Sequence, residues 1–187
     1  MSTWPARLYG NAYLAYHLRG QPHFPFKPPR EIARARDRRV RQTVLHAYRS
    51  VPYYRELLPR LGLSPDDFRT ADDLARLPIL EREDIQANPR AFLSSAYRED
   101  RCLAVRTGGS TGKSLPVLCD SAAVLQSTAY GRRDQAILTR LLGRSYGYRE
   151  VIFGSSSGIT GSTERFGLAN IAVPPGLRIV RRYHPVL

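Results

Sequence analysis

Long hydrophobic runs are absent from this chain of 187 residues. Aromatic residues gather around Tyr9 to Leu18, but no unbroken apolar run is long enough for a membrane-spanning helix or a secretory leader. We therefore expect a cytoplasmic protein without a membrane span. Hydrophobic residues still make up 42% of the composition, which is enough for a globular chain of one to two domains.

Cysteine and histidine are also scarce. Cys102 and Cys119 do not have the spacing of a metal site, and a cytoplasmic context favours free, buried thiols. The four histidines are too scattered to indicate metal ligands or a catalytic triad. We interpret them as surface or packing residues: His17, His23, His46 and His184.

Acidic residues are few. Asp and Glu number 16 against 29 Lys and Arg, so the formal net charge is +13. The densest basic cluster consists of Arg34, Arg36, Arg38, Arg39 and Arg41. The same segment carries an apolar stripe at helical spacing, formed by Ala33, Val40, Val44, Ala47 and Val51. Because the arginines lie outside this stripe, we interpret them as the solvated face of a helix and expect no specific nucleic-acid partner.

Lysine is the rarest charged residue and occurs only as Lys27 and Lys113. Lys113 closes a run that we predict to bind phosphate: Thr107, Gly108, Gly109, Ser110, Thr111, Gly112 and Lys113. Glycines bring backbone N–H groups close to a ligand, hydroxyls add donors, and lysine adds a compact, mobile charge. The alternative interpretation of this run is a flexible surface turn.

This run does not fit a Walker A loop. A Walker A loop would need glycine at position 107, where this chain has Thr107, and it would lead directly into a helix. The run continues instead into Leu115, Pro116 and Val117. Proline breaks a helix beyond its first turn, and Val and Leu favour a strand here. We predict a strand over residues 102–106, a phosphate loop, and a second strand over residues 115–119, as in a hairpin.

This loop resembles the ATP phosphate-binding loop of the adenylate-forming ligases. Three upstream phrases resemble the N-terminal helical region of the phenylacetate-coenzyme A ligase branch, with order and spacing that fit from about Arg30 to Asp120. The phrases are Val51-Pro52-Tyr53-Tyr54-Arg55-Glu56-Leu57, Leu74-Ala75-Arg76-Leu77-Pro78-Ile79-Leu80 and Glu83-Asp84-Ile85.

The resemblance implies a reaction in two steps. A small-molecule carboxylate attacks the α-phosphate of ATP to give acyl-AMP and pyrophosphate, and coenzyme A or another acceptor then takes the acyl group. The loop is implied to hold the β- and γ-phosphates, with Mg²⁺ sharing the charge neutralisation with Lys113. No catalytic residue and no Mg²⁺ ligand can be assigned from the sequence.

The chain departs from this family after the loop. Complete members are much longer and carry a catalytic lysine in a small C-terminal domain, whereas no lysine follows Lys113. Residues 160–164 imitate the family's nucleotide motif without its aromatic residue before Gly161, and we interpret them as a polar loop. We expect a ligase fragment that is inactive alone; the alternative is a noncatalytic phosphate-binding or partner subunit that docks to a separately encoded C-terminal half.

We predict an α/β fold with a helical N-terminal region over residues 1–100. An α/β segment over residues 101–187 begins a mixed β-sheet with flanking helices, and both parts belong to an incomplete ligase large domain. Further strands are expected at residues 151–153 and 177–180. The run 154–158 is either a lining of the acyl or nucleotide cavity or an ordinary loop.

Capping residues place the remaining helices. Ser64 with Pro65 begins one short helix, and Thr70 with Asp73 begins another. A longer helix starts at Asp120 or Ser121 and stops at Gly143. Its apolar positions are Ala122, Leu125, Ala129, Ile137, Leu138 and Leu141. Tyr53 and Tyr54 are expected to be core or rim aromatics rather than substrate contacts.

Overall fold

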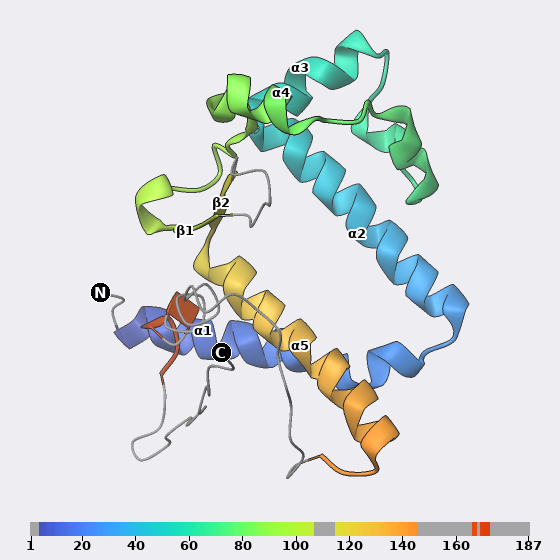
Figure 1. The fold of residues 1–187 in the computed structure, drawn as a ribbon, viewed down its shortest axis with the longest axis vertical. Coiled ribbons are helices and arrows are strands. Elements are labelled where there is room, and N and C mark those ends of the chain that lie inside the picture. Colours follow the sequence, from blue (N-terminus) through green and yellow to red (C-terminus); the bar gives the residue numbers. More distant parts are fainter. Residues whose placement is uncertain (1–3, 107–114, 146–165, 168, 173–187) are drawn as a thin grey trace, which may run out of the picture. The chain divides into compact units, whose positions relative to one another are not determined.

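The computed structural model describes residues 4–106, 115–145, 166–167 and 169–172, which are mostly helical (Figure 1). The chain forms two compact units. Unit 1 comprises residues 1–25, 102–105 and 118–187, and unit 2 comprises residues 26–101 and 106–117. The predicted division at residue 100 stays a prediction.

Unit 2 is built on α2 (Pro29–Ser50) and α3 (Pro52–Arg60). Proline at the first helical position of each helix is compatible with helix entry because its missing N–H would have no partner there. Val51 is extended between the helices, with a φ of −111°, as residues before proline usually are. The predicted arginine face of α2 is confirmed, since all five arginines of the cluster are exposed while Val44 and Val51 are buried.

The core of unit 2 forms where α2 and α3 meet the chain that follows them. Val44, Leu58 and Phe68 are buried together, and Phe68 is completely inaccessible to solvent. Partly buried side chains pack around this cluster: Val40, Tyr48, Tyr54, Leu63 and Leu77. The prediction that Tyr54 belongs to the core or its rim is therefore confirmed.

Short elements complete unit 2, namely η2 (Pro65–Asp67), η3 (Asp72–Arg76), α4 (Arg82–Ala87), η4 (Pro89–Phe92) and η5 (Glu99–Arg101). The short helices predicted at Ser64 and Thr70 are thus single 3-10 turns, and the second begins at Asp72. Phe68 follows directly after η2 and leaves helical geometry as it enters the core, which leaves no room for an α-helix.

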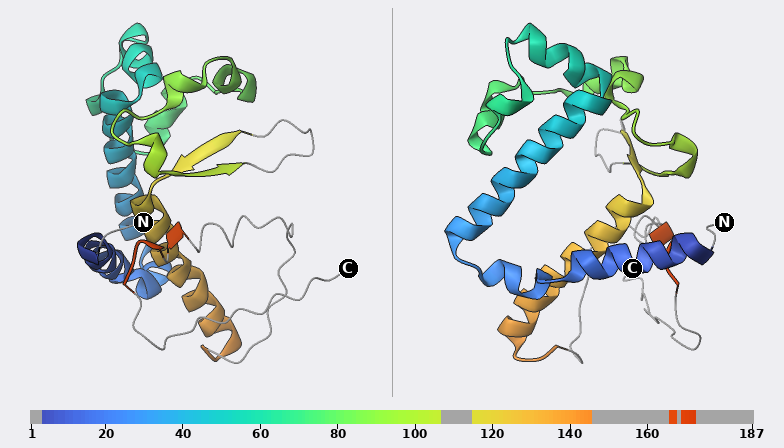
Figure 2. Two further views of the ribbon diagram at one scale, coloured as in Figure 1. Left: turned by 90° about the vertical axis from the view of Figure 1, so that its left-hand side faces the viewer. Right: turned by 180° about the vertical axis from the view of Figure 1, so that it is seen from behind.

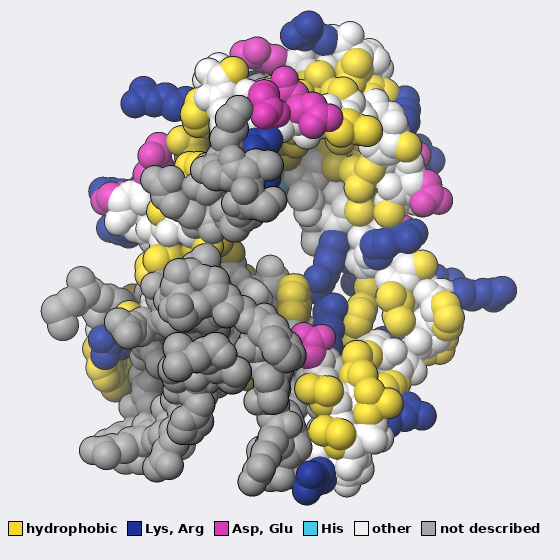
Figure 3. All heavy atoms as spheres, viewed as in Figure 1, with side chains coloured by type: hydrophobic (Ala, Val, Ile, Leu, Met, Phe, Trp, Pro, Cys, Tyr) yellow, Lys and Arg dark blue, Asp and Glu magenta, His cyan; other side chains and the backbone are white. Residues whose placement is uncertain are grey.

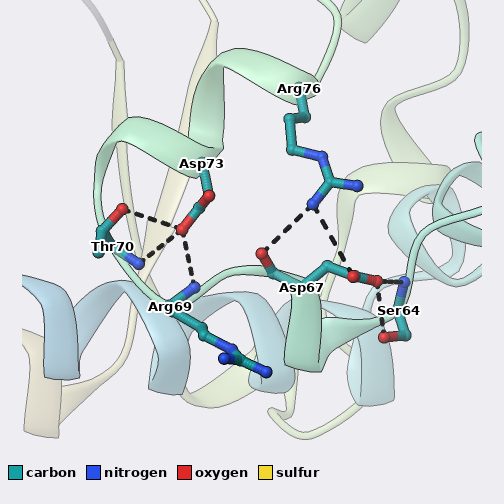
Figure 4. A network of polar contacts seen from close by, with 6 residues as sticks. All are labelled: Ser64, Asp67, Arg69, Thr70, Asp73 and Arg76. Atoms are coloured by element: carbon teal, nitrogen blue, oxygen red, sulfur yellow. Dashed lines mark hydrogen bonds and ion pairs between the residues drawn. The ribbon is translucent and has the colours of Figure 1, made fainter.

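Side-chain caps hold these two turns (Figure 4). The Asp67 carboxylate accepts hydrogen bonds from the backbone N–H and the hydroxyl of Ser64, at 2.7 and 2.8 Å. Asp73 accepts from the backbone N–H groups of Arg69 and Thr70 and from the Thr70 hydroxyl. Both acids thus cap the backbone around their own turns, which is the ordinary use of carboxylates in a first turn.

Unit 1 contains α1 (Trp4–Leu18), which packs against α5 (Ser121–Leu142), and all but the last residue of the turn η1 (Gln21–Phe26). The Arg133 guanidinium of α5 lies 3.9 Å from the centroid of the Phe24 ring and 4.5 Å from that of Tyr130. Its Nε donates to Oε1 of the buried Gln21 at 2.7 Å. This combination of cation–π contacts and a hydrogen bond ties η1 to α5.

Residues 169–172 lie directly on α1. Asn11 donates from Nδ2 to the carbonyl of Ala172 at 3.0 Å, and its Oδ1 accepts from the Ala172 N–H at 3.1 Å. Gly10 is buried beneath this segment, where a Cβ would lie 2.0 Å from the Asn170 carbonyl oxygen. Only glycine allows so close an approach of the two backbones.

Two strands, β1 (Leu103–Arg106) and β2 (Pro116–Cys119), form an antiparallel sheet (Figure 2). The two predicted strands are confirmed, each starting one residue later than expected. The α/β prediction is confirmed only at this coarse level, because a larger mixed sheet is not seen in the described ranges. The strands expected at 151–153 and 177–180 and the run 154–158 lie outside the described residues.

The predicted bounds of α5 are confirmed. Asp120 accepts a hydrogen bond from the Ala123 N–H at 2.8 Å, and Gly143 ends the helix with a left-handed φ of 67°. Leu125 and Ala129 are buried as expected, whereas Ile137 and Leu141 are exposed, so the predicted apolar stripe is covered only in its first half by the described residues.

Cys102 and Cys119 are reduced thiols next to the paired strands. Both are half-buried, not buried as expected, because a sheet of two strands covers them only in part within the described ranges. Among the described helices, none combines the length and the hydropathy needed to cross a bilayer.

Candidate functional site

The predicted phosphate-binding run joins β1 to β2. Its residues lie outside the described ranges, so their own geometry stays a prediction: Thr107, Gly108, Gly109, Ser110, Thr111, Gly112 and Lys113. The flanking strands are described, and their pairing brings the two ends of the run to one end of the same sheet. This is the hairpin frame that the sequence predicts.

The chain beyond the run discriminates between two kinds of phosphate loop. A Walker A loop leads directly into a helix. Here residues Pro116–Cys119 form a strand, and α5 begins only at Ser121. The structure therefore agrees with a hairpin loop and not with a Walker A loop.

An ion pair lies just before the hairpin. Arg98 donates from Nε and Nη2 to the two carboxylate oxygens of Asp100, at 3.0 and 2.8 Å. This paired hydrogen bond raises the pKa of Arg98 and lowers the pKa of Asp100. Since both groups are solvent-exposed, the pair fixes a local turn and contributes little to stability.

A groove with a volume of about 710 Å³ lies in unit 2. It is lined by residues from all three phrases that resemble the ligase family: Pro52, Tyr53 and Glu56 from the first, Pro78, Ile79 and Leu80 from the second, and Asp84 from the third. The structure thus brings these separate phrases together around one surface.

Aromatic and polar groups share this groove. The rings of Tyr53 and Phe92 stack with centroids 4.4 Å apart, and Glu56, Asp84, Asn88 and Arg90 add polar atoms. Tyr53 also meets Tyr54 edge-on, and burial, with a further contribution from Tyr53, raises the pKa of Tyr54. Both tyrosines are half-buried: Tyr53 lines the groove, whereas Tyr54 packs against the core of unit 2.

Metal ligands are not grouped in the described part of the chain, where no three His, Cys, Asp or Glu side chains converge on one point. The Mg²⁺ that the resemblance implies is consequently assigned to no residue here. His17 packs on Tyr13, with ring centroids 4.4 Å apart, and His46 lies near Ser50 and Tyr97. His17 is therefore a half-buried packing residue, and His46 is an exposed residue of the surface.

Comparison with known proteins finds similar sequences that share one name. The chain is 26% identical to the phenylacetate-coenzyme A ligase of Thermus thermophilus over 166 residues, which cover 84% of this chain. It is 32% identical to the Escherichia coli enzyme of that name over 84 residues, and 26% identical to that of Pseudomonas putida over 161 residues. The chain is therefore similar in sequence to the phenylacetate-coenzyme A ligases. The family resemblance inferred from the sequence is thereby confirmed.

The similarity covers only part of the length of each ligase. The chain spans 36% of the Thermus thermophilus ligase, 35% of the Pseudomonas putida ligase and 19% of the Escherichia coli ligase. No protein-family profile and no solved structure matches the chain. The ligase relationship therefore concerns one portion of those proteins.

Two features of the structure were not predicted from the sequence. The Tyr53–Phe92 stack in the groove joins residues whose pairing has no periodic signal. The contact of Asn11 with Ala172 likewise joins positions 161 residues apart, and only the buried Gly10 next to Asn11 hinted at a close approach.

Proposed function

We propose that residues 107–113 bind the triphosphate of ATP, and that the chain supplies this part of an adenylate-forming ligase. The observation that carries the proposal is the paired β1 and β2 on either side of the run, in a chain whose relatives are phenylacetate-coenzyme A ligases. A glycine-rich turn between paired strands presents successive backbone N–H groups to an anion.

In this proposal each group of the run has a separate task. The glycines at 108, 109 and 112 let the backbone approach the phosphates, and the hydroxyls of Ser110 and Thr111 donate hydrogen bonds. Lys113 places a positive charge beside the β- and γ-phosphates, which favours their departure as pyrophosphate. Mg²⁺ would add further neutralising charge when bound with ATP.

The reaction proposed is carboxylate activation. An oxygen of the carboxylate attacks the α-phosphorus of ATP, the bond between the α-phosphorus and the bridging oxygen breaks, and acyl-AMP and pyrophosphate result. Coenzyme A or another acceptor then takes the acyl group and releases AMP. The chain's contribution is to position the triphosphate, since positioning and charge neutralisation dominate such transfers.

The second candidate function is a noncatalytic subunit of a split ligase. It is favoured by the partial coverage of the relatives, because the chain spans only about a third of the two ligases that match most of its own length. Such a subunit would bind phosphate through the same loop and leave catalysis to a separately encoded half.

Exchange of labelled pyrophosphate into ATP, measured with a panel of carboxylates that includes phenylacetate, tests both proposals. We expect no exchange by the chain alone, and exchange only when the remaining portion of a ligase is supplied. Carboxylate-dependent exchange by the isolated chain would make it an enzyme in its own right and reject the subunit proposal. If ATP bound neither to the chain alone nor to the chain supplied with the rest of a ligase, both proposals would be rejected.

A further inference from the structure

The solvent-exposed side of α1 carries no charged residue. Every exposed position of this helix is aromatic, aliphatic or proline: Trp4, Pro5, Ala6, Leu8, Tyr9, Ala12, Ala15 and Tyr16. Trp4, Tyr9 and Tyr16 are 68%, 70% and 74% exposed, so these rings are largely in water. We call this surface the α1 face.

Such a surface is unusual for a helix at the outside of a protein, where charged and polar residues normally face water. The same chain shows the ordinary pattern in α2, whose exposed positions include Arg34, Arg38 and Arg41. The side of α1 that packs against the rest of unit 1 is instead the more polar one, with the half-buried Arg7 and Asn11. The α1 face is therefore not explained by the arginine-rich composition of the chain.

Unit 1 exposes more large hydrophobic side chains than it buries among its described residues. The buried ones are Val124, Leu125 and Ala129, all in the first half of α5. Ile137, Leu141 and Leu142 in the second half of α5 are exposed, and hydrophobic side chains gather over that part of the helix in Figure 3. Large exposed apolar surface is typical of a site of association.

We infer that the α1 face is the docking surface for the polypeptide that supplies the remaining portion of the ligase. The inference rests on the proposal that this chain is one part of such an enzyme. Its relatives of similar sequence are about three times as long as the matched portion, since the chain spans 36% and 35% of them. Under that proposal the rest of the ligase is a large partner, and we assign to it the surface that covers the α1 face.

The composition of the α1 face specifies the chemistry of that partner surface. Aromatic side chains bring large contact areas at low entropic cost, and Tyr and Trp are enriched at the centres of protein interfaces. Because the face has no charge to be screened, the complex should depend little on ionic strength, unlike any association that depends on the net charge of +13. The partner should present an apolar surface with few charges.

The test is co-production of the tagged chain with the portion of the Thermus thermophilus phenylacetate-coenzyme A ligase that it does not match, followed by purification through the tag. We expect the two polypeptides to be recovered together, in amounts unchanged when the salt is raised from about 0.1 M to about 0.5 M. The double substitution Tyr9→Ser/Tyr16→Ser should lower the recovery of the partner by about tenfold, as loss of central aromatic contacts does.

Tyr97→Ser in unit 2 is the matched control, because it makes the same chemical change at a tyrosine that is 50% exposed, outside the α1 face. Recovery should equal that of the unchanged chain. Far-ultraviolet circular dichroism checks that each variant retains its helices. No recovery of the partner by the unchanged chain, or equal recovery by the double variant, overturns the inference.

Other occupants of the α1 face give different results. Trp4 is the single tryptophan of the chain, so its emission reports directly on this surface in the isolated chain. Dimerisation in sedimentation, or a blue shift of Trp4 emission with vesicles of phosphatidylcholine and phosphatidylserine, overturns the inference if Tyr9→Ser/Tyr16→Ser abolishes it. Docking that persists in Lys113→Ala while ATP binding is lost separates this surface from the proposed nucleotide site.

Discussion

The carboxylate of Asp73 accepts three hydrogen bonds that hold the chain before η3 in unit 2. It accepts hydrogen bonds of 2.9 Å from the Arg69 N–H, 2.7 Å from the Thr70 N–H and 2.9 Å from the Thr70 hydroxyl. The backbone N–H of Thr70 is the largest cause of the lowered pKa of Asp73, followed by the Thr70 hydroxyl. Because the donors prefer the ionised carboxylate, the cap is coupled to pH.

We predict that this cap stabilises the folded chain above the unfolded-state pKa of aspartate, near 4, and that the effect is lost as the pH falls through the lower folded-state pKa. Asp73→Asn should therefore lower the urea midpoint at neutral pH, and the difference from the unchanged chain should close at about pH 2. Asp72→Asn is the control, since the three cap hydrogen bonds all go to Asp73 and none to Asp72 in the described part of the chain. Equal midpoints for Asp73→Asn and the unchanged chain at neutral pH would contradict this account.

Contact between backbones decides the packing of α1 at the scale of elements. Gly10 lets α1 meet the carbonyl of Asn170, and the neighbouring Asn11 pairs with both backbone groups of Ala172. One small residue and one amide therefore hold together segments from opposite ends of unit 1.

We predict that Gly10→Ala destabilises the chain by about 1–3 kcal/mol, because the new Cβ must displace the Asn170 backbone. Gly131→Ala is the matched control within α5, where an added Cβ meets no atom within 4 Å. That substitution should stabilise the chain by roughly 0.5–1 kcal/mol through better helix propensity. Urea denaturation measures both, and hydrogen exchange at Ala172 should accelerate only in Gly10→Ala; the same change in both variants would refute the close contact.

For the molecule as a whole, the sequence predicted the ends of helices and strands where capping residues, prolines and glycines mark them. Asp120 and Gly143 mark the ends of α5, and Pro52 separates α2 from α3, all as expected from residue type. The strand after the predicted phosphate-binding run followed from the Leu-Pro-Val pattern after Lys113. The ligase relationship followed from three short phrases and the loop.

Contacts between residues far apart in the sequence could not be predicted. Tyr53 stacks on Phe92 in the groove of unit 2, and α1 packs on α5 in unit 1, although neither pair shares a periodic pattern. The exposure of Ile137 and Leu141 was missed for the same reason, since an apolar stripe shows that a helix has a face to cover and not what covers it.

The central claim is that residues 107–113 hold the triphosphate of ATP, and its most direct test is calorimetric titration of ATP with Mg²⁺ into three proteins: the unchanged chain, Lys113→Ala and Lys27→Ala. Lys113→Ala should weaken binding by about tenfold or more, as loss of one charged hydrogen bond does. Lys27→Ala removes the other lysine, an exposed partner of Glu31 at 2.9 Å, and should leave the affinity unchanged. Equal affinity for ATP in Lys113→Ala and the unchanged chain would contradict the claim.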